Sequence, residues 1–361
     1  MTERRAVIAH EWLTILGGSD KTVKAMTEVL PEAKILTAVA DPAFTGEFLP
    51  GKTVETLWVD RLPKAQSRYQ RYAPAIIAAW TGKRLRDADL LISSSHFAAK
   101  AAGWGFDGPH LCYCYTPMRI AWRPDLELGR LPGRYRPAAA AVLPAARAWD
   151  RATARTVTRF AGISTAVTER IADCYGREAD LIFPPVDIES FLAAPKRPGR
   201  HLLAFVRLVG YKRFDLAVKV CSENALPLVV AGAGPQEARL RQMAGPTVRF
   251  AGRVDDGTYA DLLSDAIALL FPGEEDFGIV PVEAQAAGCP VVAYGAGGAL
   301  DTVEDGRTGV LFHRQDERSL LGGIERAIDT DWDEAALREG SKRFSRERFR
   351  EAFSRFVGSS T

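Results

Sequence analysis

Short apolar runs alternate with longer amphipathic segments along the chain, a pattern typical of parallel sheets covered by helices. In the first half, Ala6–Ala9 predicts a strand, and Gly17-Gly18 opens an amphipathic segment that extends to Leu30 and predicts a helix. Later apolar runs predict three further strands, at Lys34–Ala38, Asp89–Ser93 and His110–Tyr115.

The pattern restarts after a stretch rich in proline. Pro184-Pro185 and the segment Ala193–Arg200, which holds two more prolines, form the best linker in the sequence. The strands expected after it are His201–Val206, Leu226–Ala231, Val248–Phe250, Ala266–Phe271 and Pro290–Ala293. The helices expected between them are Asp215–Ser222, Pro235–Ala244, Tyr259–Asp265 and Val280–Ala287, the last ended by Gly288.

A chain of 361 residues is long enough for two domains. We predict an α/β protein with two doubly wound, Rossmann-like domains, residues 1–187 and 188–340, followed by a charged terminal helix over 341–361. Domains of this kind bind ligands at the carboxyl ends of their strands, so we expect the two to face each other across a ligand-binding cleft.

The most informative stretch is FPGEEDFGIVPVEAQAAG, residues 271–288. A helix that begins near Gly278 leaves the N–H groups of Gly278, Ile279 and Val280 available to a phosphate. The Glu275 carboxylate, in the preceding loop with Asp276, can accept hydrogen bonds from sugar hydroxyls. The alternative is that these carboxylates only complement the helix dipole and that Glu283 is a solvated surface residue.

A second loop, Arg207 to Arg213, also follows an expected strand. Arg207 and Lys212 could converge on a diphosphate and neutralise the charge that develops as a nucleoside diphosphate leaves. The alternative is a pair of solvated surface cations.

Glycines mark several expected strand ends. Gly17 and Gly18 would allow a ligand to approach the backbone closely, and Gly232, Gly234 and the glycines after Tyr294 lie at equivalent strand ends. An ordinary turn is the alternative for each of these groups. None of these groups matches the dinucleotide pattern Gly-x-Gly-x-x-Gly. The two Asp-x-Asp pairs, at 87–89 and 329–331, fall away from the expected site, so we expect no metal ion and no other cofactor.

Composition narrows the class of protein further. The net charge is +2, with basic residues in excess in the first half and acidic residues in excess in the second. The five cysteines include no Cys-x2-Cys pair, which argues against a zinc site or a disulfide framework. No recognisable nucleic-acid-binding module, signal peptide or membrane span is present, so we expect a cytoplasmic protein that does not bind nucleic acid.

Four segments resemble the retaining glycosyltransferase family 4, whose members have the GT-B fold. They are EEDFGIVPVEAQAAGCPVVAYGAGGALDTVEDGRTGVLF (274–312), RLVGYKRFDLAVKV (207–220), AGAGPQEARL (231–240) and HEWLTILGGSDKTV (10–23). The resemblance runs from His10 to Phe312 and is greatest to bacterial mannosyltransferases of surface and exopolysaccharide assembly. It implies a metal-independent retaining transferase that moves a hexose, with GDP-mannose as the lead donor, to a glycan or polyprenyl-linked acceptor. It also implies that the terminal helix packs back on the first domain.

The resemblance assigns roles to individual residues. It implies that Glu283 binds the ribose and that Gly17-Gly18 closes over the donor diphosphate held by Arg207 and Lys212. The donor sugar would be bound by Glu275 and the backbone at Phe277–Val280, beside Asp276. The resemblance also places Arg253 and Val254 near the base, where we also expect Gly232 and Gly234. His96, which follows an expected strand, and Thr116 are candidates for the acceptor side; a structural role is the alternative for His96.

One position departs from the family. The subgroup usually has His where this chain has Tyr115, and the family histidine lies near the donor sugar. A tyrosine hydroxyl keeps a hydrogen bond but does not become a cation near neutral pH. Tyr115 therefore keeps open the alternative of a nucleotide-sugar-binding protein without turnover. A second alternative is another enzyme on this architecture, a nucleotide-sugar epimerase or phosphorylase.

Residues 61–86 contain seven basic residues, no acidic ones, and the aromatic residues Tyr69, Tyr72 and Trp80. Such a segment suits a peripheral position on anionic lipid at the inner face of the cell membrane. A solvated basic helix is the alternative, and the sequence leaves the oligomeric state open.

Overall fold

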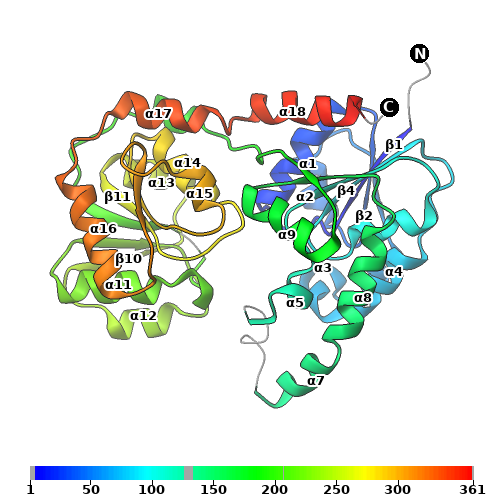
Figure 1. The fold of residues 1–361 in the computed structure, drawn as a ribbon, viewed down its shortest axis with the longest axis horizontal. Helices are drawn as coiled ribbons and strands as arrows, with labels where there is room; N and C mark the ends of the chain where they lie inside the picture. The colour runs from blue at the N-terminus through cyan, green and yellow to red at the C-terminus, as the bar shows by residue number, and fades with distance from the viewer. Residues whose placement is uncertain (1–4, 126–132, 206, 360–361) are drawn as a thin grey trace. The chain divides into compact units, whose positions relative to one another are not determined.

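The computed structural model describes residues 5–125, 133–205 and 207–359, and the chain divides into two compact units. The first unit runs to Pro185 and takes in the chain again from Phe349 onward, whereas the second comprises Val186–Arg348. Figure 1 shows the helices of each unit arranged around its sheet.

The sheet of the first unit has seven parallel strands in the order β3-β2-β1-β4-β5-β6-β7. The strands are β1 (Ala6–His10), β2 (Lys34–Thr37), β3 (Val54–Thr56), β4 (Leu90–Ser95), β5 (His110–Cys114), β6 (Arg159–Gly162) and β7 (Ala179–Leu181). The α-helices are α1 (Gly18–Val29), α2 (Pro42–Phe48), α3 (Ala65–Arg68), α4 (Ala73–Gly82), α5 (Arg119–Trp122), α7 (Arg136–Ala141), α8 (Leu143–Ala154) and α9 (Thr165–Tyr175). Short 3-10 helices are η1 (Trp58–Arg61), η2 (Tyr69–Tyr72), η3 (Ala99–Gly105) and η4 (Gly133–Tyr135).

The sheet of the second unit has six parallel strands in the order β10-β9-β8-β11-β12-β13. The strands are β8 (His201–Phe205), β9 (Leu228–Ala231), β10 (Val248–Gly252), β11 (Ala266–Phe271), β12 (Val291–Tyr294) and β13 (Gly309–Phe312). The helices are α10 (Glu189–Ala193), η5 (Gly210–Lys212), α11 (Phe214–Glu223), α12 (Glu237–Met243), α13 (Asp256–Ser264), α14 (Ile279–Ala286), α15 (Ala299–Thr302), α16 (Glu317–Asp329) and α17 (Glu334–Lys342). The two doubly wound, Rossmann-like domains predicted from the sequence are confirmed.

The core of the second unit follows the alternation of a buried strand. Leu202 and Ala204 of β8 pack in one cluster with Leu216 of α11 and Ile324 of α16. The intervening Leu203 is equally buried, so by the two-residue period of a strand it faces the opposite side of the sheet. Helices therefore cover both faces, and only the strand ends are left for a ligand.

The last helix, α18 (Arg346–Gly358), places three buried phenylalanines at a helical spacing: Phe349, Phe353 and Phe356. Phe349 meets Tyr113 of β5 edge-on, with ring centroids 5.7 Å apart. This apolar stripe explains why the chain from Phe349 onward belongs to the first unit. Residues 360–361 of the expected helix lie outside the described residues, as does Val206 at the end of the expected strand 201–206.

The segment Ala193–Arg200 is not the linker between the units, because it lies inside the second one. The Arg197 N–H donates to the Ser264 carbonyl at 3.1 Å, and the Arg200 N–H donates to the Asp265 carbonyl at 2.8 Å. Its proline, glycine and basic residues suggested a linker, but its backbone is held against the end of α13. Among the described residues, no helix is both long and apolar enough to span a bilayer.

Candidate functional site

Two loops of the second unit meet through an ion pair. Lys212 ends η5, in the connection that follows β8, and Glu275 lies in the loop after β11. The Lys212 Nζ lies 2.7 Å from the Glu275 Oε1, and both side chains are largely buried. Because β8 and β11 are neighbours in the sheet, their carboxyl ends bring together two residues that the sequence singled out separately.

Glycines allow these loops to approach closely. A Cβ on Gly273 would lie 2.6 Å from the Lys212 Cα, and a Cβ on Gly298 would lie 2.2 Å from the Phe277 Cα. The Gly298 N–H donates to the Glu275 carbonyl at 2.8 Å. Close backbone packing therefore fixes the position of the Glu275 loop.

The helix after this loop starts at the expected place. Gly278 has a φ of +93°, a left-handed conformation that glycine adopts without strain, and α14 begins at Ile279. The first turn of α14 thus holds Ile279 and Val280, whose N–H groups come before the first intrahelical hydrogen bonds. Phe277 is buried and packs edge-on against Phe344 at 5.5 Å, anchoring the turn.

Glu283 is held in place inside the same helix. The Tyr259 hydroxyl donates to the Glu283 Oε2 at 2.9 Å, and the Tyr259 ring stacks on Phe205 with centroids 3.6 Å apart. Burial, together with the charge of Glu283, raises the pKa of Tyr259 well above its usual value, so its hydroxyl stays a donor. The role of Tyr259 was not predicted from the sequence. Tyr259 and Glu283 are separated by β11 and the loop after it, and no local pattern links residues that far apart.

Among the other residues expected to bind the donor, the two arginines are more exposed than Lys212 and Glu275. Arg207 is exposed, and among the described residues its guanidinium has no hydrogen-bond or ion-pair partner. Arg253 is exposed and Val254 half-buried in the connection from β10 to α13. The Gly232 N–H, directly after β9, donates to the carbonyl of Gly252 at 2.6 Å, at the end of β10 just before this connection.

In the first unit, Tyr115 lies half-buried just after β5. Its hydroxyl is 2.9 Å from the Ser94 Oγ and donates to the Ser19 carbonyl at 3.1 Å. Ser19 directly follows the Gly17-Gly18 pair, so the expected diphosphate loop and Tyr115 are joined by a hydrogen bond.

His96 is held through its backbone by a buried carboxylate. The Glu11 Oε1 accepts hydrogen bonds from Ser95 Oγ and from the N–H groups of residues 96–99, at 2.7–3.1 Å. The His96 ring packs edge-on against Trp12 at 5.0 Å. Burial lowers the pKa of His96, an effect that the Glu11 charge opposes.

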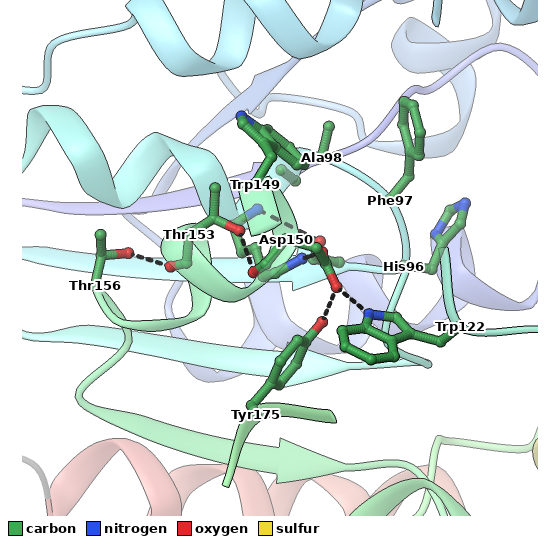
Figure 2. Close-up of polar contacts among 12 residues, drawn as sticks. His96, Phe97, Ala98, Trp122, Trp149, Asp150, Thr153, Thr156 and Tyr175 are labelled. Atoms are coloured by element: carbon green, nitrogen blue, oxygen red, sulfur yellow. Dashed lines mark hydrogen bonds and ion pairs between the residues drawn. The ribbon is translucent and has the colours of Figure 1, made fainter. Parts of the chain in front are cut away.

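Thr116 and helix α5 are fixed by polar contacts that the sequence did not suggest. The buried Thr116 hydroxyl accepts a hydrogen bond from Arg170 at 2.8 Å. Figure 2 shows the Trp122 and Tyr175 side chains converging on Asp150, whose Oδ2 accepts a hydrogen bond from each at 2.7 Å. Asp150 also forms a fully buried ion pair with Lys100.

The basic segment 61–86 turns out to be only partly available to a partner. Most of its basic side chains are exposed, but Trp80 is fully buried and Tyr69 packs on Trp12 at 4.5 Å. Tyr72 donates its hydroxyl to the Pro63 carbonyl. The aromatic residues therefore serve the fold of this unit, and any surface binding relies on the cations.

Known proteins resemble this chain in two ways. Residues 189–344 match the sequence model of the glycosyl transferases group 1 family. A glycogen synthase of Thermus thermophilus is 37% identical over 169 residues, which cover 42% of this chain and 39% of that protein. The chain thus spans about two fifths of the length of this relative.

Solved structures cover nearly the whole chain. HepE of Anabaena, solved with UDP and glucose, has a TM-score of 0.72 at 16% identity, covering 99% of this chain and 100% of HepE. The lipopolysaccharide outer core galactosyltransferase WaaB has a TM-score of 0.72 at 14% identity, with the same coverage. The whole chain therefore has the GT-B fold of these proteins, and its residues 189–344 are similar in sequence to the glycosyl transferases group 1 family.

Proposed function

We propose that this protein is a glycosyltransferase that moves a hexose from a nucleoside-diphosphate sugar to an acceptor hydroxyl. The observation that carries the proposal is the Lys212–Glu275 pair, which places a cation and a carboxylate 2.7 Å apart at the strand ends of the second unit. A donor diphosphate needs the cation, and the hydroxyls of its sugar need the carboxylate.

Each residue then has a task in the reaction. Lys212 and Arg207 neutralise the leaving diphosphate, together with the N–H groups at the start of α14. Glu275 keeps acceptor capacity beyond its bond to Lys212, because a carboxylate has about four lone-pair sites for hydrogen bonds. Glu283, oriented by Tyr259, binds the ribose.

The proposed stereochemical course is retention. The bond from the anomeric carbon to the diphosphate oxygen breaks, and the acceptor oxygen bonds to the same face of that carbon. The acceptor proton passes to the leaving phosphate, so no carboxylate base and no metal ion are required. NMR analysis of the anomeric centre of the product tests this, and an inverted product would rule it out.

Donor and acceptor are proposed by class. GDP-mannose is the donor that the family resemblance favours. The relative named glycogen synthase suggests glucose as the sugar instead, and the neighbour holding UDP and glucose makes UDP-glucose the rival donor. The acceptor is a glycan or polyprenyl-linked sugar, used at the cytoplasmic face of the membrane. The exposed cations of residues 61–86 would hold the protein on anionic lipid. Flotation with vesicles that contain or lack anionic lipid tests this. Failure of the protein to float with anionic vesicles in low salt would refute it.

The test is release of nucleoside diphosphate from each donor, with and without acceptor, in the presence of EDTA. The proposal expects acceptor-dependent release from one donor class. Conversion of the donor to its epimer without acceptor would identify an epimerase instead. Binding without any turnover would identify a protein that has kept the donor site and lost the reaction. This outcome is tested because Tyr115 stands where the family has a histidine near the donor sugar.

A further inference from the structure

Four buried or half-buried side chains of the first unit form a continuous chain of hydrogen bonds. The His10 Nε2 lies 3.2 Å from the Asp20 Oδ1, and the His10 Nδ1 lies 3.0 Å from the Ser94 Oγ. The Ser94 Oγ in turn lies 2.9 Å from the Tyr115 hydroxyl. His10 ends β1, Ser94 lies near the end of β4, Asp20 lies in α1, and Tyr115 follows β5, so four elements meet here.

Both ends of this chain return to the same turn. The Asp20 Oδ2 accepts a hydrogen bond from the Gly17 N–H at 2.7 Å, and the Tyr115 hydroxyl donates to the Ser19 carbonyl at 3.1 Å. The hydrogen bonds therefore form a closed circuit that starts and ends at residues 17–20. The Gly17-Gly18 turn and the Tyr115 hydroxyl are held as one piece.

The members of this circuit are shielded from solvent. The His10 and Asp20 side chains are 1% and 6% exposed. Both find their hydrogen-bond partners within the protein, so water is not needed to complete the network.

We propose that His10, Asp20 and Ser94 are positioning residues for the transfer reaction: they fix the Tyr115 hydroxyl and the Gly17-Gly18 turn relative to one another. This inference rests on the proposed function, in which that turn covers the donor diphosphate and Tyr115 lies near the donor sugar. Reacting groups lose about a hundredfold in rate when displaced by about 1 Å, so a rigid circuit behind them has a direct effect on turnover.

The neighbouring residue on β4 provides a matched control. Ser93 Oγ forms an equally buried hydrogen bond with a histidine, the His110 Nε2, at 2.9 Å. Ser93 points to the opposite face of the strand from Ser94. Among the described residues its hydroxyl meets His110 and the Leu111 carbonyl, and it makes no hydrogen bond to Tyr115 or Gly17. Ser93→Ala and Ser94→Ala therefore remove the same kind of bond at adjacent positions.

The experiment compares Ser94→Ala, Tyr115→Phe and their double variant with Ser93→Ala, by kcat and by the KM for donor. We expect Ser94→Ala to lower kcat about 10- to 100-fold with the donor KM changed less than about twofold. We expect the double variant to be no slower than Tyr115→Phe alone, because both changes break one circuit. Ser93→Ala should keep kcat within about twofold of wild type.

A second measurement does not depend on activity. Hydrogen exchange of the amides at residues 17–20 should accelerate about fivefold in Ser94→Ala and His10→Gln, and stay unchanged in Ser93→Ala. Equal kcat values for Ser94→Ala and Ser93→Ala, additive effects in the double variant, or unchanged exchange at the turn would each overturn the inference. An inactive wild type with the expected exchange pattern would instead overturn the proposed function and leave the circuit standing.

Discussion

The ammonium group of Lys212 lies 2.7 Å from the carboxylate of Glu275, although the two residues come from loops after different strands. Removing Lys212 leaves Glu275 uncompensated beside the proposed diphosphate site. Because hydrogen bonds to charged groups contribute about 1.5–3 kcal/mol, Lys212→Ala should weaken donor binding roughly 10- to 100-fold, measured by titration calorimetry.

The control is another lysine of the same unit. Lys219 on α11 forms exposed ion pairs with Glu317 and Glu223 and lies outside the proposed site. Lys219→Ala should leave donor affinity unchanged. Equal losses in the two variants would mean that general charge, and not the Lys212–Glu275 pair, attracts the donor.

The contact between Tyr259 and Glu283 makes a separate prediction about the ribose. Tyr259→Phe keeps the stacking on Phe205 and removes only the hydroxyl that holds Glu283. We expect the KM for donor to rise about fivefold with little change in kcat, since one hydrogen bond contributes about 1 kcal/mol to ground-state binding. The control is Tyr72→Phe, which removes a tyrosine hydrogen bond in the first unit and should change neither KM nor kcat. A fall in kcat in Tyr259→Phe would argue against a role in ribose binding alone.

The buried pair of Lys100 and Asp150 predicts a large effect on stability. Burial acts to lower the pKa of Lys100, but the Asp150 carboxylate more than offsets this, and the pKa is raised. Asp150→Asn leaves the ammonium group buried without a countercharge and should cost about 3–5 kcal/mol of unfolding free energy.

Asp180 offers the comparison, because its ion pair with Arg159 is 36% exposed on both sides. Asp180→Asn should cost less than about 1 kcal/mol in the same urea denaturation experiment. The account of the buried pair fails if Asp150→Asn is no more destabilising than Asp180→Asn.

His110 predicts how stability depends on pH. Burial lowers the pKa of His110 to about 3, whereas the unfolded chain takes up its proton near the usual value of 6.5. Between these values only the unfolded state is protonated, so His110 favours folding fully above pH 6.5 and progressively less as the pH falls toward 3. The unfolding free energy should decline by up to about 1.4 kcal/mol per pH unit from this one group. His110→Gln should show a shallower decline from about pH 7 to about pH 5; an unchanged slope would contradict the prediction.

Local pattern was enough to predict the strands and α-helices of the second unit from β8 to β12, whereas β13 was not among the expected strands. The strand Ala266–Phe271 has its expected bounds, and α14 begins one residue before the expected Val280. Both succeed for a local reason: a continuous apolar run makes a buried parallel strand, and Gly278 and Gly288, both with positive φ, mark the ends of the helix.

Contacts between distant residues were beyond local pattern. His10 meets Ser94 because β1 and β4 are paired in register, a relation that no periodicity along the chain reveals. The segment Ala193–Arg200 has the composition of a linker, and only its backbone hydrogen bonds to Ser264 and Asp265 show that it belongs to the second unit. One sequence feature could have drawn attention to His10. The polar pair His10-Glu11 follows an apolar run directly, at the strand end where ligand-binding loops begin.

The most direct measurement is the shift in thermal stability of the wild-type protein with GDP-mannose, UDP-glucose, UDP-galactose, GDP and UDP, each with EDTA present. A ligand that binds only the folded state adds about 2.7 kcal/mol of stability at a hundredfold excess over its dissociation constant. The account predicts stabilisation by the nucleotides of one base, undiminished by EDTA and lost in Lys212→Ala. No stabilisation by any of these donors, or equal stabilisation of wild type and Lys212→Ala, would contradict it.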